Sequence, residues 1–135
     1  MTDVVLDASV VAKWFTRADE RGSRRARELR DQYLQGELFV TVPSLLFLEL
    51  LNAAGRRWSW SEKSLLELAV ALEELEFEVL EPDLASVAEW TARGLTAYDA
   101  TYVALAEAQG TPVITDDDHI LHLAEAVAQP LVPRG

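Results

Sequence analysis

Short apolar runs alternate along the chain with segments in which apolar residues recur every three or four positions. The runs have the length of strands, and the periodic segments are typical of amphipathic helices. Strands that alternate with helices favour a parallel sheet with helices on both faces. The pattern therefore predicts an α/β fold, a three-layer α/β/α sandwich around a central parallel sheet of four to five strands.

Turn and capping residues set the expected limits of these elements. Ser61 and Thr96 stand where helix N-caps are expected, and Gly110 stands where a helix ends. The predicted strands span residues 3–7, 38–42, 77–80 and 112–115, and the tail 130–135 is expected to add a fifth strand at an edge. The predicted helices span residues 10–15, 19–34, 45–57, 62–75, 83–91, 96–109 and 120–127.

The chain has 135 residues, half of them hydrophobic and none of them cysteine. This fits a single domain, residues 1–135, without a disulfide framework or a thiolate metal site. The longest apolar run, residues 42–51, is too short and too polar to span a bilayer, and the N-terminus has no secretory pattern. We therefore expect a cytoplasmic protein that does not bind membranes. Residues 131–135 resemble a protease site from an expression tag, so no function is inferred from them.

The formal net charge of −11 is distributed unevenly. Residues 1–63 hold ten of the twelve basic residues and nine acidic ones, whereas residues 64–135 hold two basic and fourteen acidic residues. This asymmetry is compatible with two functionally different surfaces, or with an acidic surface that serves solubility alone.

Four acidic residues stand where a carboxylate is costly unless it is paired or binds a metal. Asp7 ends an apolar run, and Glu49 interrupts an apolar helix. Asp99 opens a helical segment, and Asp117 follows the fourth predicted strand. Ligands of open parallel sheets bind outside the carboxyl ends of the strands, and all four side chains are expected to reach that edge. Clustered there, they would bind a hard divalent cation and support metal-assisted hydrolysis of phosphodiesters.

Three of these acidic positions also have a purely structural explanation. Asp7 can cap the helix that follows it, and Asp99 can belong to a capping box that begins at Thr96. Residues 116–118 can form a solvated turn. Glu49 is different because apolar residues surround it in the sequence, so a buried partner or a metal is expected for it.

The same residues carry a resemblance to a known family. Four motifs occur in order, Val-Leu-Asp7-Ala-Ser9, Glu49-Leu-Leu-Asn52, Tyr98-Asp99-Ala-Thr-Tyr102-Val-Ala-Leu-Ala106 and Thr115-Asp-Asp117. In order and spacing they resemble the PIN domain and, within that family, the VapC-type toxins of prokaryotic toxin–antitoxin pairs. The resemblance covers essentially the whole chain.

The resemblance implies a set of site residues. Its catalytic and metal-binding residues are Asp7, Glu49, Asp99 and Asp117, with Asp116 as a less favoured alternative to Asp117. Its hydroxyl or polar residues at the rim are Ser9, Asn52 and Thr115. It further implies an Mg²⁺- or Mn²⁺-dependent endoribonuclease that hydrolyses RNA, forms a homodimer and is held inactive by a cognate antitoxin. We expect Asp7 and Asp99 to hold the first ion most directly, while Asp117 and Glu49 complete its shell or orient water.

An arginine-rich segment is the candidate for contacts with RNA phosphates, although a solvated helix paired with its own acidic residues would have the same sequence. The candidates are Lys13, Arg17, Arg21, Arg24 and Arg25. The tryptophans are interpreted as core or interface residues, with base stacking as the alternative. They are Trp14, Trp58, Trp60 and Trp90.

Two other kinds of function remain as alternatives. A PIN-type nuclease can act in RNA processing without a toxin role, and a non-catalytic module can bind Mg²⁺ as a phosphoacceptor receiver does, or serve dimerisation. A receiver requires paired acids after the first strand and a Lys after the fifth. Here Asp7 is followed by Ala-Ser and no Lys lies beyond residue 63, so the sequence favours the nuclease.

Overall fold

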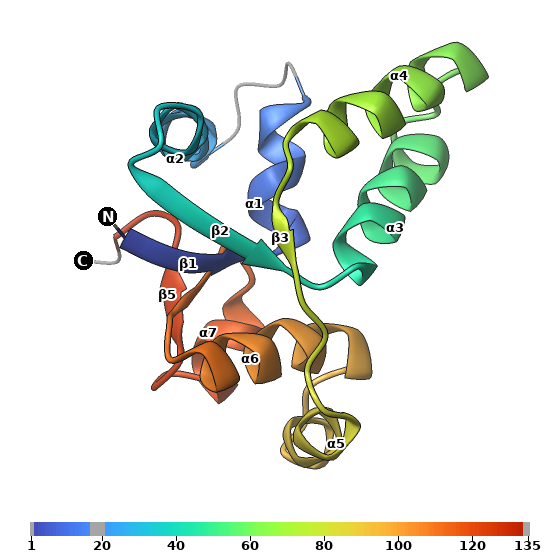
Figure 1. The fold of residues 1–135 in the computed structure, drawn as a ribbon. Coiled ribbons are helices and arrows are strands. Elements are labelled where there is room, and N and C mark those ends of the chain that lie inside the picture. Colours follow the sequence, from blue (N-terminus) through green and yellow to red (C-terminus); the bar gives the residue numbers. More distant parts are fainter. Residues whose placement is uncertain (1, 17–20, 134–135) are drawn as a thin grey trace.

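A parallel sheet lies at the centre of the computed structural model, which describes residues 2–16 and 21–133 (Figure 1). Its strand order is β3-β2-β1-β4-β5, and each neighbouring pair is parallel. The strands are β1 (Thr2–Leu6), β2 (Leu38–Val42), β3 (Glu78–Val79), β4 (Val113–Thr115) and β5 (Ala128–Pro130). The predicted parallel sheet is confirmed, with the larger of the two expected strand numbers.

Helices cover both faces of the sheet and complete the three predicted layers (Figure 1). One face carries α1 (Ala8–Val11), α2 (Ser23–Leu34), α3 (Leu45–Asn52) and α4 (Glu62–Glu74). The other carries α6 (Ala97–Gln109) and α7 (Asp118–Leu123), with α5 (Leu84–Ala92) packed against α6. A 3-10 turn, η1 (Ala12–Trp14), follows α1, and a π-helical turn, η2 (Ala53–Arg57), continues α3. Within the described residues, none of the helices has the length and apolarity needed to cross a membrane.

The core forms on both faces of the sheet because the strands carry apolar residues at successive positions. Val4, Val5 and Leu6 of β1 each have 3 % or less of their surface exposed. Helices on both faces of a parallel sheet require such continuous apolar runs. Helix α6 follows the same rule, since it lies between the sheet and α5 and its residues 102–106 are buried.

The strand order places the switch point of the sheet between β1 and β4. After β1 the chain builds the sheet in one direction through β2 and β3, and it then returns to add β4 on the other side of β1. Leu6 pairs with Ile114, so the chain leaves both strands at neighbouring positions. In open parallel sheets this is where ligands bind.

Helix α2 begins later than the sequence predicted. Gly22 precedes Ser23 with a φ of 87°, a left-handed conformation that cannot belong to a right-handed helix. The predicted helix over residues 19–34 is therefore wrong at residues 21 and 22, and residues 17–20 lie outside the described part of the chain. Arg21 consequently lies in the turn before α2.

The C-terminal elements also differ from the prediction. The helix expected over residues 120–127 is α7, which starts two residues earlier and ends at Leu123. The fifth strand is Ala128–Pro130, residues 131–133 of the predicted tail strand are not part of it, and residues 134–135 lie outside the described part of the chain. Pro130 lacks a backbone N–H and suits only an edge strand, which β5 is. Leu131 follows as a buried residue whose N–H donates to the Thr115 carbonyl (2.9 Å).

Candidate functional site

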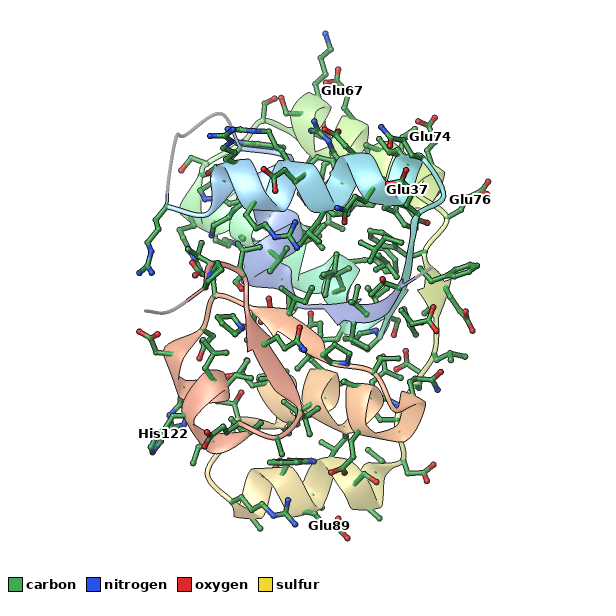
Figure 2. All side chains as sticks on the ribbon, turned by 90° about the vertical axis from the view of Figure 1, so that its left-hand side faces the viewer. Glu37, Glu67, Glu74, Glu76, Glu89 and His122 are labelled. Atoms are coloured by element: carbon green, nitrogen blue, oxygen red, sulfur yellow. The ribbon has the colours of Figure 1, made fainter. Side chains whose placement is uncertain are left out.

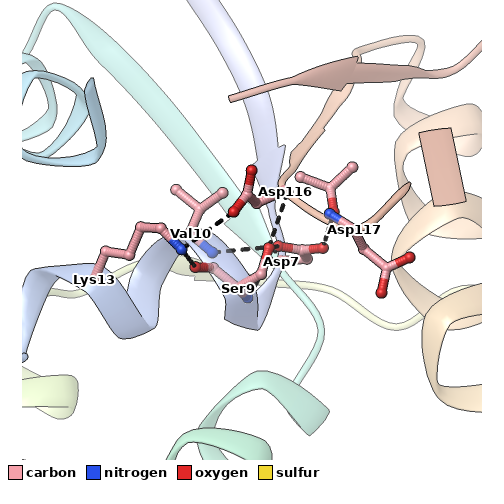
Figure 3. Close-up of polar contacts among 7 residues, drawn as sticks. Asp7, Ser9, Val10, Lys13, Asp116 and Asp117 are labelled. Atoms are coloured by element: carbon pink, nitrogen blue, oxygen red, sulfur yellow. Dashed lines mark hydrogen bonds and ion pairs between the residues drawn. The ribbon is translucent and has the colours of Figure 1, made fainter. Parts of the chain in front are cut away.

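Asp7 lies directly after β1 and caps the helix that follows (Figure 3). Its Oδ1 accepts hydrogen bonds from the N–H groups of Ser9 (3.1 Å) and Val10 (3.4 Å) and from the Ser9 hydroxyl (2.6 Å). Its Oδ2 accepts a hydrogen bond from the hydroxyl of Thr115, the last residue of β4. Because Asp7 is the cap, helix α1 begins at Ala8, two residues before the predicted start.

The carboxyl group of Asp7 is buried among neutral hydrogen-bond donors. Only 4 % of the residue is exposed. Burial raises the pKa of Asp7 from 3.8 to about 6; hydrogen bonds from Ser9, Thr115 and Val10 oppose this rise, and the charge of Asp117 adds to it. A buried carboxylate in such a setting gains more from a bound cation than an exposed one would.

The turn after β4 is tied to Asp7 through two hydroxyl groups (Figure 3). The N–H of Asp117 donates to Thr115 Oγ1 (3.0 Å), and the N–H of Asp116 donates to Ser9 Oγ (3.0 Å). Both hydroxyls donate in turn to the Asp7 carboxyl group. The two polypeptide segments at the switch point are thus held together by side chains of the predicted site.

The carboxyl groups of Asp116 and Asp117 point in different directions (Figure 3). That of Asp116 forms an ion pair with Lys13 (Oδ2 to Nζ, 3.4 Å). That of Asp117 caps α7 by accepting from the N–H groups of His119 (2.9 Å) and Ile120 (3.0 Å). Asp117 lines the cavity between α1, α3 and α6, whereas Asp116 does not.

Glu49 on α3 and Asp99 on α6 approach the same place from opposite layers. The hydroxyl of Tyr102, which has 1 % of its surface exposed, donates a hydrogen bond to Glu49 Oε1, so Glu49 has the buried partner expected for it. Burial raises the pKa of Glu49, the Tyr102 hydrogen bond lowers it and the charge of Asp99 raises it. Burial also raises the pKa of Asp99, to which the charge of Asp117 adds. Thr96 caps α6 by accepting from the Asp99 N–H (3.0 Å).

The four predicted acidic residues line a single cavity of about 340 Å³. Ser9 and Asn52, two of the three residues predicted for the rim, also line it. Thr115 does not line the cavity, because it is fully buried and reaches the site through its hydrogen bond to Asp7. The other lining residues are Ala8, Ala12, Leu50, Ala53, Arg57, Trp58 and Tyr102.

The acidic groups of the cavity fit a hydrated divalent ion. Carboxyl and hydroxyl oxygens are the ligands that Mg²⁺ and Mn²⁺ prefer. In the described part of the chain, no three acidic, His or Cys side chains lie close enough together to bind one ion directly. Mg²⁺ does not require three direct carboxylate ligands, because it retains several waters and commonly takes only one or two carboxylates.

Most of the residues predicted to contact phosphate lie away from the cavity. Arg21, Arg24 and Arg25 do not line it. Arg24 and Arg25 pair with Glu28 (3.8 and 3.3 Å), which is the solvated-helix arrangement that the sequence left open. Arg17 lies outside the described residues. For these arginines phosphate binding stays a prediction.

Among the predicted phosphate contacts that the structure describes, Lys13 is the one that lies next to an acidic residue of the switch point. Its Nζ donates to the Ser9 carbonyl (3.2 Å) in addition to pairing with Asp116, and the residue has 9 % of its surface exposed. The ammonium group therefore holds the turn after β4 against the start of α1. This arrangement argues for a structural contribution near the site more than for direct contact with RNA.

Acidic residues of the second half of the chain are spread over both helical layers. Glu67 and Glu74 project from α4, and Glu89 projects from α5 on the opposite side of the sheet (Figure 2). Arginine residues of α2 lie in the same layer as α4. The charge asymmetry of the sequence therefore does not divide the described molecule into one acidic and one basic face.

The sequence did not predict that Arg57 and Trp58 would line the cavity, and Tyr102 was named only as part of a motif. Glu49, Ala53 and Arg57 are spaced by four residues, and this spacing places side chains on one face of a helix. That periodicity was the available signal for Arg57. Tyr102 and Glu49 are 53 residues apart, so no local pattern in the sequence could indicate the contact between them.

The fold and the cavity together define a small parallel α/β domain with four acidic residues at its switch point. A family model of the PIN domain matches residues 4–126, which include all four, and the chain belongs to this family. The resemblance found in the sequence is thereby confirmed at the level of the family, and it indicates a nuclease of the PIN type. Comparison with curated proteins finds no significant match.

Solved structures share the fold over nearly the whole chain. PAE2754 from Pyrobaculum aerophilum is 24% identical, with a TM-score of 0.68, and the match covers 96% of this chain and 90% of that one. FitAcB from Neisseria gonorrhoeae is 17% identical, with a TM-score of 0.67 and coverage of 93% and 95%. FitAB bound to an IR36 DNA fragment is 14% identical, with a TM-score of 0.65 and coverage of 98% of both chains. At these identities the similarity establishes a common fold.

Proposed function

We propose that this chain is a metal-dependent endoribonuclease that acts as the toxin of a toxin–antitoxin pair. One observation carries the proposal: acidic residues from the end of β1, from α3, from α6 and from the turn after β4 line a single cavity in a PIN domain. Carboxylates alone would repel a phosphodiester, so such a cavity accepts one only with a cation. The choice of RNA and the toxin role rest on the motifs that resemble the VapC-type toxins.

Mg²⁺ or Mn²⁺ is the proposed cofactor. When bound, such an ion supplies positive charge to the phosphate oxygens and activates water. In this proposal Asp7 and Asp99 hold it most directly, and Asp117 and Glu49 complete its shell or orient water. Thr115 and Tyr102 each donate a hydrogen bond to one of these carboxyl groups and so fix its orientation.

The proposed protein partners are a cognate antitoxin and a second copy of this chain. Leu66 and Val70 support a protein contact, because these large apolar side chains of α4 are 63 % and 54 % exposed. The four acidic residues of the cavity support an antitoxin that presents a basic residue to them. The proposal treats residues 1–135 as one nuclease domain that acts in the cytoplasm, where its RNA substrate is found.

Cleavage of a panel of cellular RNAs by the purified protein tests the nuclease. We expect cleavage with Mg²⁺ or Mn²⁺, none with EDTA, and a loss of at least a hundredfold in rate for Asp7→Asn and for Asp99→Asn. The matched control is Asp3→Asn, which removes an exposed carboxylate from β1 and should cleave as the wild type does. Cleavage that survives both site substitutions would contradict the proposal.

A second experiment separates the toxin from a PIN nuclease of RNA processing. The chain is expressed in its native host with and without the product of any small gene that lies next to its own. A toxin should arrest growth when expressed alone, and the neighbour's product should relieve the arrest and copurify with the chain. Normal growth together with cleavage of one precursor RNA would favour the processing role instead.

A further inference from the structure

The turn between α5 and α6 lies against the first turn of α7. Nε2 of His119, in that first turn, is 3.0 Å from the carbonyl oxygen of Gly94, which lies just beyond the end of α5. A carbonyl oxygen only accepts hydrogen bonds, so Nε2 carries the proton in this contact. One side chain thus connects two segments that are 25 positions apart in the chain.

Gly94 permits this contact because it has no side chain. Its φ of 116° is one that residues with a Cβ rarely adopt. A Cβ at this position would lie 3.2 Å from Cδ1 of Leu123, the last residue of α7. The turn therefore lies directly on α7, and its carbonyl group is within reach of His119.

Each of the two connected segments positions one acidic residue of the cavity. Asp117 is the N-cap of α7, and its Oδ1 accepts a hydrogen bond from the N–H of His119 (2.9 Å). On the other side, the chain runs from Gly94 to Thr96, the N-cap of α6, whose hydroxyl accepts from the N–H of Asp99 (3.0 Å). The contact between His119 and Gly94 therefore fixes the N-termini of α6 and α7 relative to each other.

Electrostatic forces act against this arrangement when no cation is bound. Asp99 and Asp117 line one cavity, and like charges repel each other. Burial of Asp99 and the charge of Asp117 raise the pKa of Asp99, whereas the Thr96 hydrogen bond and a positive charge on His119 lower it. The repulsion favours a larger separation of the two helix N-termini, and the contact between His119 and Gly94 opposes that movement.

We propose that His119 is a positioning residue, which ties α7 to the turn before α6 and so keeps Asp99 and Asp117 at the separation that binds the ion. The inference rests on the proposed nuclease function and adds a residue to it. His119 does not line the cavity, so it acts through the two carboxyl groups. A pair of ligands that is already in place binds a cation more tightly than a pair that must first be brought together.

Binding of Mn²⁺ to the purified protein, measured by calorimetry, tests this role without relying on cleavage. The variants are His119→Ala, His119→Phe, which keeps a ring without a donor, and His119→Gln, whose amide N–H can reach the same carbonyl oxygen. The matched control is His122→Ala, because His122 projects from the surface of the same helix (Figure 2). Urea unfolding in EDTA reports the stability of each variant.

We expect His119→Ala and His119→Phe to weaken Mn²⁺ binding by about tenfold, at the lower end of the loss typical of residues that orient metal ligands. His119→Gln should restore most of the affinity, and His122→Ala should bind Mn²⁺ as the wild type does. In cleavage assays with Mg²⁺, His119→Ala should lower kcat by a similar factor with little change in KM, since misplaced carboxylates affect the reaction more than the binding of RNA.

The results that would overturn the inference can be told apart. Tighter Mn²⁺ binding by His119→Ala would show that His119 acts through its charge alone, because the loss of a cation beside Asp99 favours metal binding. Lower stability in urea with unchanged Mn²⁺ affinity would assign the contact to folding, and full affinity in His119→Phe would exclude the hydrogen bond. Each of these results leaves the nuclease intact, whereas a wild-type protein that neither binds Mn²⁺ nor cleaves RNA would remove the proposed function as well.

Discussion

The hydroxyl of Thr115 donates a hydrogen bond to Asp7, and the same oxygen accepts one from the N–H of Asp117 (3.0 Å). Thr115 ends β4, Asp7 follows β1, and 108 positions separate them in the chain. One buried hydroxyl thus fixes both acidic residues at the switch point. It does so because β1 and β4 are neighbours in the sheet although they are far apart in sequence.

Replacement of Thr115 by Val keeps its shape and removes this hydroxyl. The N–H of Asp117 then loses its acceptor, and Asp7 loses a hydrogen bond that lowers its pKa. We expect Thr115→Val to reduce the free energy of unfolding by about 1–3 kcal/mol, the range for an unsatisfied buried polar group. Urea unfolding measures this, with Thr115→Ser as the control. If the two variants are equally stable, the hydroxyl does not have the role assigned to it.

Asp7 should make the metal-free protein less stable as the pH rises. Its pKa is raised from 3.8 to about 6, so the folded state binds its proton more tightly than the unfolded state does. The resulting stabilisation is fully present below about pH 4 and is lost as the pH rises through about 6, and for a shift of two units it amounts to about 3 kcal/mol. Asp7→Asn does not titrate, so relative to wild type its stability should increase between pH 4 and pH 7.

Urea unfolding of wild type and Asp7→Asn in EDTA across this pH range measures the difference. Asp3→Asn, on the exposed start of β1, controls for the loss of one negative charge. Because Mg²⁺ would neutralise the buried carboxylate, the ion should raise the stability of the wild type at pH 7 and have less effect on Asp7→Asn. Parallel pH curves for the three proteins would show that burial of Asp7 does not cost stability.

Patterns in the sequence were sufficient to predict the parallel sheet and to predict that the four acidic residues would lie near one another. Val4–Leu6 of β1 and Val113–Thr115 of β4 are buried at successive positions, whereas β2 alternates between buried and more exposed residues, and both patterns are typical of strands. The predicted limits of α2 and α7 were wrong because the backbone conformation of a single residue decides where each of these helices begins or ends. Gly22 adopts a left-handed φ and delays α2, and Ala124 ends α7 with a φ of −116°. Neither conformation is specified by hydrophobic periodicity.

Contacts between distant segments set the remaining features of the site. The sequence predicted that four acidic residues would converge, and they line one cavity. It could not indicate that Tyr102 would hold Glu49, or that Lys13 would draw Asp116 away from the cavity, because those contacts depend on side-chain directions in the folded chain. Arg21, Arg24 and Arg25 do not line the cavity, a position that charge alone could not specify, and their contact with phosphate stays a prediction.

Lys13 is expected to act on the site through Asp116. Its ammonium group pairs with Asp116 (3.4 Å) and contacts the Ser9 carbonyl (3.2 Å), with both side chains largely screened from solvent. Lys13→Met should lower kcat by about three- to tenfold with little change in KM, because a shifted turn misplaces Asp117 without removing a substrate contact.

A double-mutant cycle with Asp116→Asn tests whether Lys13 acts through this pair. We expect a coupling of about 1 kcal/mol in the free energy of unfolding, and the kinetic effects of the two substitutions should not add. Lys13→Arg should restore part of kcat. Additive effects, or a rise in KM alone, would instead indicate that Lys13 contacts the RNA directly.

Tyr102→Phe should shift the pH dependence of cleavage. The Tyr102 hydroxyl donates to Glu49 and lowers its pKa, against burial, which raises it. Without that hydrogen bond the pKa of Glu49 rises further, so the ionised form appears only at higher pH. If cleavage requires ionised Glu49, the acidic limb of the kcat profile moves to higher pH. The control is Tyr98→Phe, four residues earlier on α6, where the ring is 63 % exposed. An unchanged limb in Tyr102→Phe together with normal kcat would mean that Glu49 is held in place by Tyr102 but takes no part in the reaction.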